Sequence, residues 1–152
     1  MLGRLQIVIQ VGAEAAQVRD RDAFLLLITQ TARELTGATY SSLGFVDGDV
    51  IEWQMAAGKP LEEVRGYRQP LEQGLCGWVV RHGRPRRADD VTQEQEYLQQ
   101  YEEMRSELDV PIKVGEKVTG VLNVESPERA AFDDEDEALL QVLACFVALA
   151  WD

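Results

Sequence analysis

Cys76 is the side chain whose setting in this sequence most favours covalent chemistry. It lies in Gly74-Leu75-Cys76-Gly77, where Gly74 frees the backbone and a helix is expected to begin. A helix N-terminus lowers the pKa of a thiol and so favours the nucleophilic thiolate. A small residue packed at the start of a helix gives the same pattern, and we favour that interpretation. Cys145 lies among apolar residues near the C-terminus and is expected to be a small buried hydrophobe.

The patterns of common enzymes and metal sites are absent from the sequence. It contains no Gly-x-x-x-x-Gly-Lys-Ser/Thr, no Gly-x-Ser-x-Gly, no His-Glu-x-x-His and no Cys-x-x-Cys. The single histidine, His82, lies in a polar run with Arg81 and Arg84 that is typical of a solvated turn. We therefore expect no catalytic residue and no metal site.

Composition limits the partners that the chain can have. Its 152 residues, 45% of them hydrophobic, are enough for one domain with a buried core. The 15 Lys and Arg against 27 Asp and Glu give a charge of −12, which repels nucleic acid and anionic lipid. Two cysteines and the lack of a signal-peptide pattern predict a cytoplasmic location. The apolar stretch at residues 139–151 is shorter than the roughly 20 residues that a bilayer requires, so no membrane partner is expected.

Three helices are predicted from apolar residues that recur at helical spacing. The first is amphipathic, and its apolar positions are Leu5, Val8, Ile9, Gly12 and Ala16. The second covers residues 24–35 and stops at Gly37. The last begins near Ala138, after Asp134 and Glu137 at the spacing of a capping box.

Two hairpins are predicted from residues typical of strands. Residues 38–46 and 50–56 flank Asp47-Gly48-Asp49, which is a strong signal for a short hairpin turn. Residues 108–114 alternate between apolar and polar types, and the chain then turns at Gly115-Glu116 into residues 118–125. The intervening residues 57–107 are mixed, with short helices expected at 61–64 and 77–81 and a polar helix at 94–105. Together these elements predict an α+β fold.

Six short motifs occur in the order in which GAF domains carry them. They are Gly74-Leu75-Cys76-Gly77-Trp78-Val79-Val80, Gly83-Arg84-Pro85, Asp89-Asp90-Val91, Ser106-Glu107-Leu108-Asp109-Val110-Pro111-Ile112, Gly120-Val121-Leu122-Asn123-Val124-Glu125-Ser126 and Phe132-Asp133-Asp134-Glu135-Asp136. From about Phe24 to the C-terminus the sequence resembles a GAF domain. The resemblance implies a single GAF domain over residues 1–152, with a six-stranded antiparallel sheet, the terminal helices on one face and a ligand pocket on the other.

Polar residues on two strands are candidates for this pocket. One set of alternate residues on the last strand is expected to face the helices: Val118, Gly120, Leu122 and Val124. Asn123 and Glu125 then point to the opposite face, where burial requires hydrogen-bond partners, unless that face is an edge wetted by solvent. By the resemblance, Glu107 comes just before the fifth strand and accepts a hydrogen bond from a ligand amine or amide. A carboxylate there equally suits the end of a helix.

Aromatic and basic side chains add further candidates. Trp53, Tyr97 and Tyr101 offer surfaces suited to stacking on a flat or apolar ligand, and core packing explains them equally well. The predicted ligand-binding residues are Trp53, Cys76, Tyr97, Tyr101, Glu107, Asn123 and Glu125. A basic cluster borders this pocket, and it either steers an anion or forms a solvated loop balanced by nearby acidic residues: Arg81, Arg84, Arg86 and Arg87.

The known roles of GAF domains require different residues. The setting of Cys76 resembles that in free methionine-(R)-sulfoxide reductases, but the segment that carries their attacking cysteine corresponds to residues 95–107, which contain none. Bilin-binding members commonly have histidine after the attachment cysteine, whereas Gly77 follows Cys76. Members that bind cyclic nucleotides carry a lysine where Val124 stands, although Asn123 and Phe132 match their pattern.

We therefore expect a regulatory sensor that binds an unidentified small molecule and passes the signal through its terminal helices in a bacterial signalling protein. The alternatives are an enzyme of the free methionine-(R)-sulfoxide reductase type and a degenerate GAF domain that serves only dimerisation. Residues 1–19 are predicted to form a dimerisation helix, because the last helix has apolar residues on more than one side. These residues alternatively do no more than cover the sheet. The sequence identifies no cofactor.

Overall fold

The computed structural model describes residues 2–95 and 103–150. Six antiparallel strands form one sheet in the order β3-β2-β1-β6-β5-β4. The strands are β1 (Tyr40–Asp47), β2 (Val50–Ala57), β3 (Arg68–Pro70), β4 (Arg86–Ala88), β5 (Ser106–Val114) and β6 (Lys117–Ser126). The helices are α1 (Leu2–Ala15), α2 (Arg21–Thr36), α3 (Gly74–His82) and α4 (Asp134–Ala150), with short 3₁₀ turns η1 (Leu61–Glu63) and η2 (Val91–Gln93).

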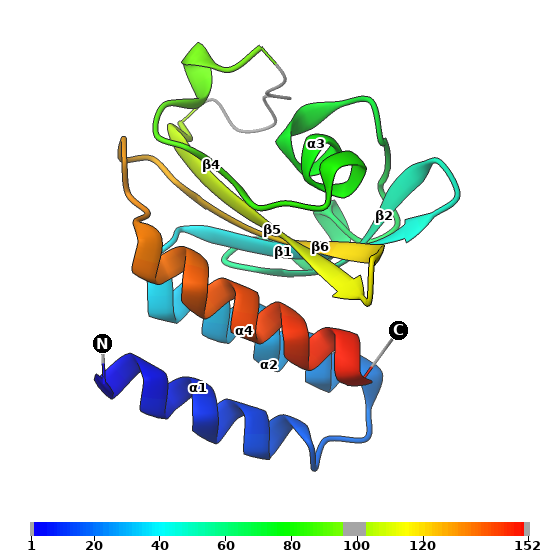
Figure 1. Ribbon diagram of the computed structural model, residues 1–152, viewed down its shortest axis with the longest axis vertical. Helices are drawn as coiled ribbons and strands as arrows, with labels where there is room; N and C mark the ends of the chain where they lie inside the picture. The colour runs from blue at the N-terminus through cyan, green and yellow to red at the C-terminus, as the bar shows by residue number, and fades with distance from the viewer. Residues whose placement is uncertain (1, 96–102, 151–152) are drawn as a thin grey trace.

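Helices cover both faces of the sheet. Figure 1 shows α1, α2 and α4 stacked below the sheet and α3 above it. The α+β class, the six-stranded antiparallel sheet and the terminal helices on one face are thus confirmed.

The two predicted hairpins form the centre of this sheet. Gly48 and Gly115 adopt positive φ angles of 64° and 63° at the two turns, a backbone conformation that glycine enters without steric cost. Along β6, Leu122 and Val124 belong to the core between the sheet and the helices α2 and α4. Val121 instead belongs to a second apolar cluster, which contains Cys76 of α3. The predicted alternation is therefore confirmed for Leu122 and Val124, and Asn123 and Glu125 lie on the α3 face. It is wrong for Val118, whose Cγ2 atom would lie 3.7 Å from a Cβ on Gly83 at the end of α3, because the β5–β6 pairing shifts register between Ile112 and Lys113.

The helices on the lower face are held by capping and by apolar packing. The Asp20 side chain accepts a hydrogen bond from the Ala23 backbone N–H at the start of α2, and Gly37 ends that helix at a φ of 70°. Fully buried residues of α2 and α4, such as Ile28 and Leu143, form one core with Leu108 and other residues of the sheet. This packing fixes the sheet on one side and leaves its other side to α3 and the loops.

Two predictions about the terminal helices are wrong in detail. Val8 and Ile9 were expected on one apolar side of the first helix, but Val8 is 1% exposed and Ile9 is 62% exposed. The buried stripe of α1 is Val8, Val11 and Ala15, which the helical period of 3.6 residues brings to one side. Cys145 is exposed rather than buried, since the buried stripe of α4 passes through Ala144 and Leu143 beside it.

The predicted helix at residues 94–105 is not supported at either end. Gln95 and Glu103 lie in turns, and the chain enters β5 in an extended form from Met104. Residues 96–102 lie outside the described part of the chain. Among the helices that the structure describes, none combines the length and hydrophobicity needed to cross a bilayer.

Gly120 marks a point where β6 and β1 approach too closely for a side chain. A Cβ atom on Gly120 would lie 2.5 Å from the backbone oxygen of Gly44, and backbone in a central strand cannot move aside cheaply. We expect Gly120→Ala to lower the free energy of unfolding by about 1–3 kcal/mol, measured by urea denaturation. Gly3→Ala is the matched control, because nothing lies within 4 Å of a Cβ there. Equal stability of the two variants would contradict this account of the strand contact.

Candidate functional site

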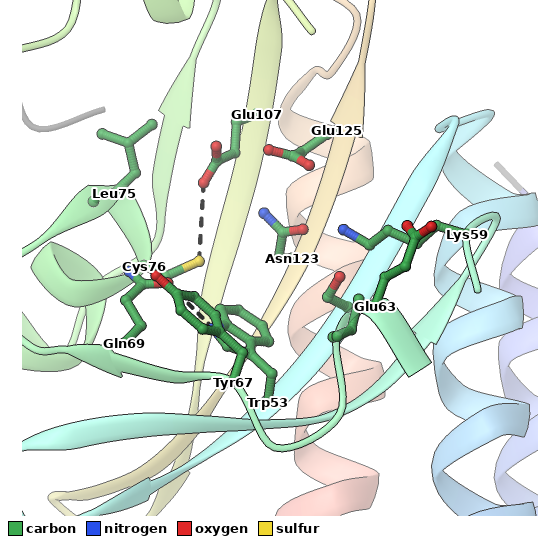
Figure 2. A pocket seen from close by; sticks show the side chains of 13 residues that line it. Trp53, Lys59, Glu63, Tyr67, Gln69, Leu75, Cys76, Glu107, Asn123 and Glu125 are labelled. Carbon is green, nitrogen blue, oxygen red and sulfur yellow. Dashed lines mark hydrogen bonds between the residues drawn. The ribbon is translucent and has the colours of Figure 1, made fainter. Parts of the chain in front are cut away.

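A cavity of about 400 Å³ lies on the α3 face of the sheet. Its walls come from β1, β2, β3, β5, β6, the start of α3 and the loop that follows β2. Figure 2 shows the side chains converging on this space from the strands on one side and from the loop on the other. The lining residues are Ser42, Trp53, Lys59, Glu63, Val64, Tyr67, Gln69, Gly74, Leu75, Cys76, Glu107, Asn123 and Glu125.

Five of the seven residues predicted from the sequence meet at this cavity. They are Trp53, Cys76, Glu107, Asn123 and Glu125. The other two, Tyr97 and Tyr101, lie outside the described residues. The solvent-wetted alternative for Asn123 and Glu125 is wrong, since these side chains are 5% and 9% exposed. The segments after β2 and at the start of α3 lie over this part of the sheet and line the cavity with these two residues.

Trp53 combines the two roles considered for it. Its ring packs with Ile51 and Val121 in the smaller apolar cluster, and it also lines the cavity. The indole Nε1 donates to the Gln69 side-chain oxygen at 3.2 Å, and the Gln69 amide nitrogen donates to the Gln73 backbone oxygen at 2.9 Å. These two bonds fix the ring edge at the cavity wall.

Sequence reasoning missed several lining residues. Lys59, Glu63 and Tyr67 come from the loop after β2, where no periodic pattern reveals which side chains turn inward. Ser42 lies on β1 opposite Asn123 of β6, and it is 4% exposed. The signal that could have identified Ser42 was its place on a strand next to the one that carries Asn123 and Glu125.

The acidic part of the wall is formed by neighbouring positions of β5 and β6. Glu107 is paired in register with Glu125, and Asp109 is paired with Asn123. The Asn123 Nδ2 group donates to Asp109 Oδ1 at 2.7 Å, whereas Asp109 Oδ2 is buried and has no hydrogen-bond partner in the described part of the chain. Asp109 is fully buried and was not predicted as a site residue.

Burial changes the protonation of these groups. It raises the pKa of Glu125 to about 8, with repulsion from Glu107 adding to the effect and Lys59 opposing it. It raises the pKa of Asp109 to about 6, against the hydrogen bond from Asn123. Burial also lowers the pKa of Lys59, while the charge of Glu125 opposes that shift. In the ligand-free site the Glu125 carboxyl group therefore retains its proton near neutral pH.

Cys76 is a protonated thiol in this environment. Burial, followed by the charges of Asp109 and Glu107, raises its pKa well above the ordinary value. Its Sγ donates to Glu107 Oε2 over 3.9 Å, the contact drawn in Figure 2. The structure thus supports the packed thiol rather than the activated nucleophile.

The basic cluster is largely occupied within the protein. Arg86 pairs with Glu94 at 2.7 Å, Arg87 pairs with Asp134 at 3.0 Å, and Arg81 donates to the Leu71 backbone oxygen. Arg84 lies over the Trp78 ring at 5.3 Å. None of these arginines lines the cavity described above. The interpretation as a solvated surface fits these contacts better than anion steering.

The family model for the GAF domain matches residues 18–152 of this sequence. The chain belongs to the GAF family. A curated relative, protein YtsP of Bacillus subtilis strain 168, is 34% identical over 77 residues. That match covers 51% of this chain and 47% of the relative, so the aligned part is about half the length of each protein.

Solved structures share the fold over nearly the whole chain. The GAF domain of a phosphoenolpyruvate-protein phosphotransferase from Coxiella burnetii is 23% identical, with a TM-score of 0.90, over 97% of this chain and 92% of that one. The free methionine-R-sulfoxide reductase of Neisseria meningitidis, in complex with its substrate, is 24% identical, with a TM-score of 0.86, over 96% and 86%. This fold thus occurs both in a domain of a phosphotransferase and in a free methionine-R-sulfoxide reductase.

The raised pKa of Glu125 predicts how stability depends on pH in the ligand-free protein. Its pKa is 4.5 in the unfolded chain and about 8 in the folded one, so the folded state binds the proton more tightly. This contribution to stability is complete below pH 4.5 and is lost as the pH rises through 8. We expect urea denaturation between these limits to show a fall in stability that is smaller in Glu125→Gln. The exposed Glu116→Gln is the control and should follow the wild type; equal pH profiles for all three would contradict the assignment.

Proposed function

We propose that the cavity binds a small organic molecule through a hydrogen-bond donor such as an amine or amide. The observation that carries this proposal is a buried hydroxyl group in the wall that has no hydrogen-bond partner among the described residues. This group is Ser42 Oγ, and the carboxyl groups of Glu107 and Glu125 line the same cavity. Buried polar groups without partners are costly, and a ligand donor offsets that cost. A volume of about 400 Å³ suits a metabolite-sized molecule.

The second part of the proposal is that binding is passed to the terminal helices. Glu107 lines the cavity, while Leu108 and Val110 on the same strand pack in the core that includes Leu143 of α4. A shift of β5 at the cavity therefore displaces residues that contact α4. We infer a regulatory module on this basis.

Native mass spectrometry of freshly purified protein tests the binding proposal. We expect a small molecule to be retained, and Ser42→Ala to weaken its binding about three- to tenfold through one lost hydrogen bond. Ser41→Ala is the matched control: Ser41 is equally buried in the same strand, but it does not line the cavity. Only apoprotein, or equal losses in both variants, would contradict the proposal.

A sensor of this type should show no reductase turnover on free methionine sulfoxide. The reaction requires an attacking thiolate and a second thiol within reach to resolve it. Cys76 is a buried thiol in α3, and Cys145 lies on α4 across the sheet, as Figure 1 shows for these helices. We expect no turnover above background in an assay with a thiol reductant. Activity that disappears in Cys76→Ser would overturn this interpretation and make Cys76 the nucleophile.

We further propose that α1 and α4 form a homodimer interface with a second copy of the chain. An exposed stripe on α4 consists of Val142, Cys145 and Leu149, and Leu149 is 86% exposed. Ile9 is exposed on α1, and a Gly12–Phe146 contact joins the two helices nearby. Burial of these apolar side chains favours association.

Analytical ultracentrifugation at micromolar concentration tests the interface. We expect a dimer for the wild type and a shift to monomer in Ile9→Glu, because a carboxylate would be buried at the contact. Val8 is unsuitable for this test, since it is part of the core within one chain. Gln93→Glu adds the same charge at an exposed site and should remain dimeric. A monomeric wild type, or a dimeric Ile9→Glu variant, would remove these helices as the interface.

A further inference from the structure

Three potential metal ligands lie together at the inner end of the cavity. The Sγ atom of Cys76 and one carboxyl oxygen each from Glu107 and Asp109 all lie within 4.8 Å of one another. Cys76 comes from the start of α3, and the two carboxyl groups come from alternate positions of β5. Their exposed fractions are 5%, 5% and 0%, so they form a buried cluster rather than a patch of surface charge.

Asp109 carries a second and independent sign of a bound cation. Its Oδ1 atom accepts a hydrogen bond from Asn123 at 2.7 Å, and its Oδ2 atom is buried with no partner among the described residues. A carboxylate that is oriented through one oxygen and has the other free is the usual arrangement of a metal ligand with an outer hydrogen bond. An ion at this position would satisfy the unpartnered oxygen.

We propose that Cys76, Glu107 and Asp109 bind a divalent transition-metal ion such as Zn²⁺, Fe²⁺ or Co²⁺. A thiolate ligand selects these ions over Mg²⁺ and Ca²⁺, which prefer oxygen donors alone. The positive charge of the ion offsets the repulsion between the two carboxylates and favours ionisation of the thiol. Movements of the three side chains by about 1 Å would bring their donor atoms to bonding distances of about 2.0–2.3 Å.

The cavity determines what else such an ion can contact. Cys76 and Glu107 line the cavity, whereas Asp109 lies behind them and is absent from its wall. Three protein ligands leave at least one coordination position of a four-coordinate ion open on the cavity side. The site is therefore of the open kind, at which water or a small ligand completes the coordination. The metal site does not depend on the organic ligand proposed above.

Cobalt titration of the full chain tests the proposal. The protein is first stripped with a chelator, and Co²⁺ is then added while the near-ultraviolet absorption of thiolate-to-cobalt charge transfer is recorded. We expect one equivalent to bind and Zn²⁺ to displace it, with no effect of Mg²⁺. Cys145→Ser should keep the band, because Cys145 is exposed on the far helix. Cys76→Ser should lose it, and Asp109→Asn should weaken Co²⁺ binding at least tenfold.

A wild-type measurement keeps the proposal testable if a variant does not fold. X-ray absorption of the cobalt-loaded wild-type protein should show one sulfur ligand together with oxygen ligands. Any of three results would overturn the site. They are the lack of a charge-transfer band in the wild type, a coordination shell without sulfur, and a band that survives Cys76→Ser but not Cys145→Ser. Failure to retain an organic molecule in mass spectrometry would leave these results unchanged, so the two proposals fail separately.

Discussion

The burial of three carboxyl groups on one face of β5 and β6 is the constraint on which the site depends. An isolated carboxylate out of water is so costly that the group binds a proton or finds a partner. Here Asn123 supports Asp109, Lys59 opposes the charge on Glu125, and the remaining cost appears as raised pKa values for all three acids. Because the acids are buried, this fold favours the binding of a cation or a hydrogen-bond donor in the cavity.

The two-faced sheet makes this constraint relevant beyond the cavity. Side chains alternate along a strand, so the residues between the acids of β5 necessarily point at the helices. Leu108 and Val110 are fully buried in that core, where packing is too dense to absorb movement. A change in charge above the sheet and a change in helix packing below it are therefore linked through one short strand. This link needs no moving loop.

The sequence predicted on which face of the sheet a side chain lies better than it predicted how deeply that side chain is buried. Alternation correctly placed Asn123 and Glu125 opposite the helices. The same alternation on β5 gave no reason to separate Asp109 from Lys113, yet the first is fully buried and the second is half-buried. The pairing of β5 with β6 shifts register between Ile112 and Lys113, so the alternation that holds at Asp109 does not extend to Lys113. Ser42 and Lys59 were missed for another reason, since cover by a loop leaves no period in the sequence.

Two opposing physical effects act on the pKa of the Cys76 thiol. A helix N-terminus favours a thiolate by only about 0.3–1 kcal/mol at an exposed position. Burial acts in the opposite direction, and the charges of Asp109 and Glu107 add to it, so the pKa of the thiol rises well above its ordinary value. Burial first, and the acidic neighbours second, therefore keep the thiol protonated despite its position at the start of α3. The same neighbours become an advantage once a cation lies between them, because its charge reverses the sign of their effect on the sulfur. The reactivity of Cys76 is thus determined by the contents of the cavity rather than by the helix.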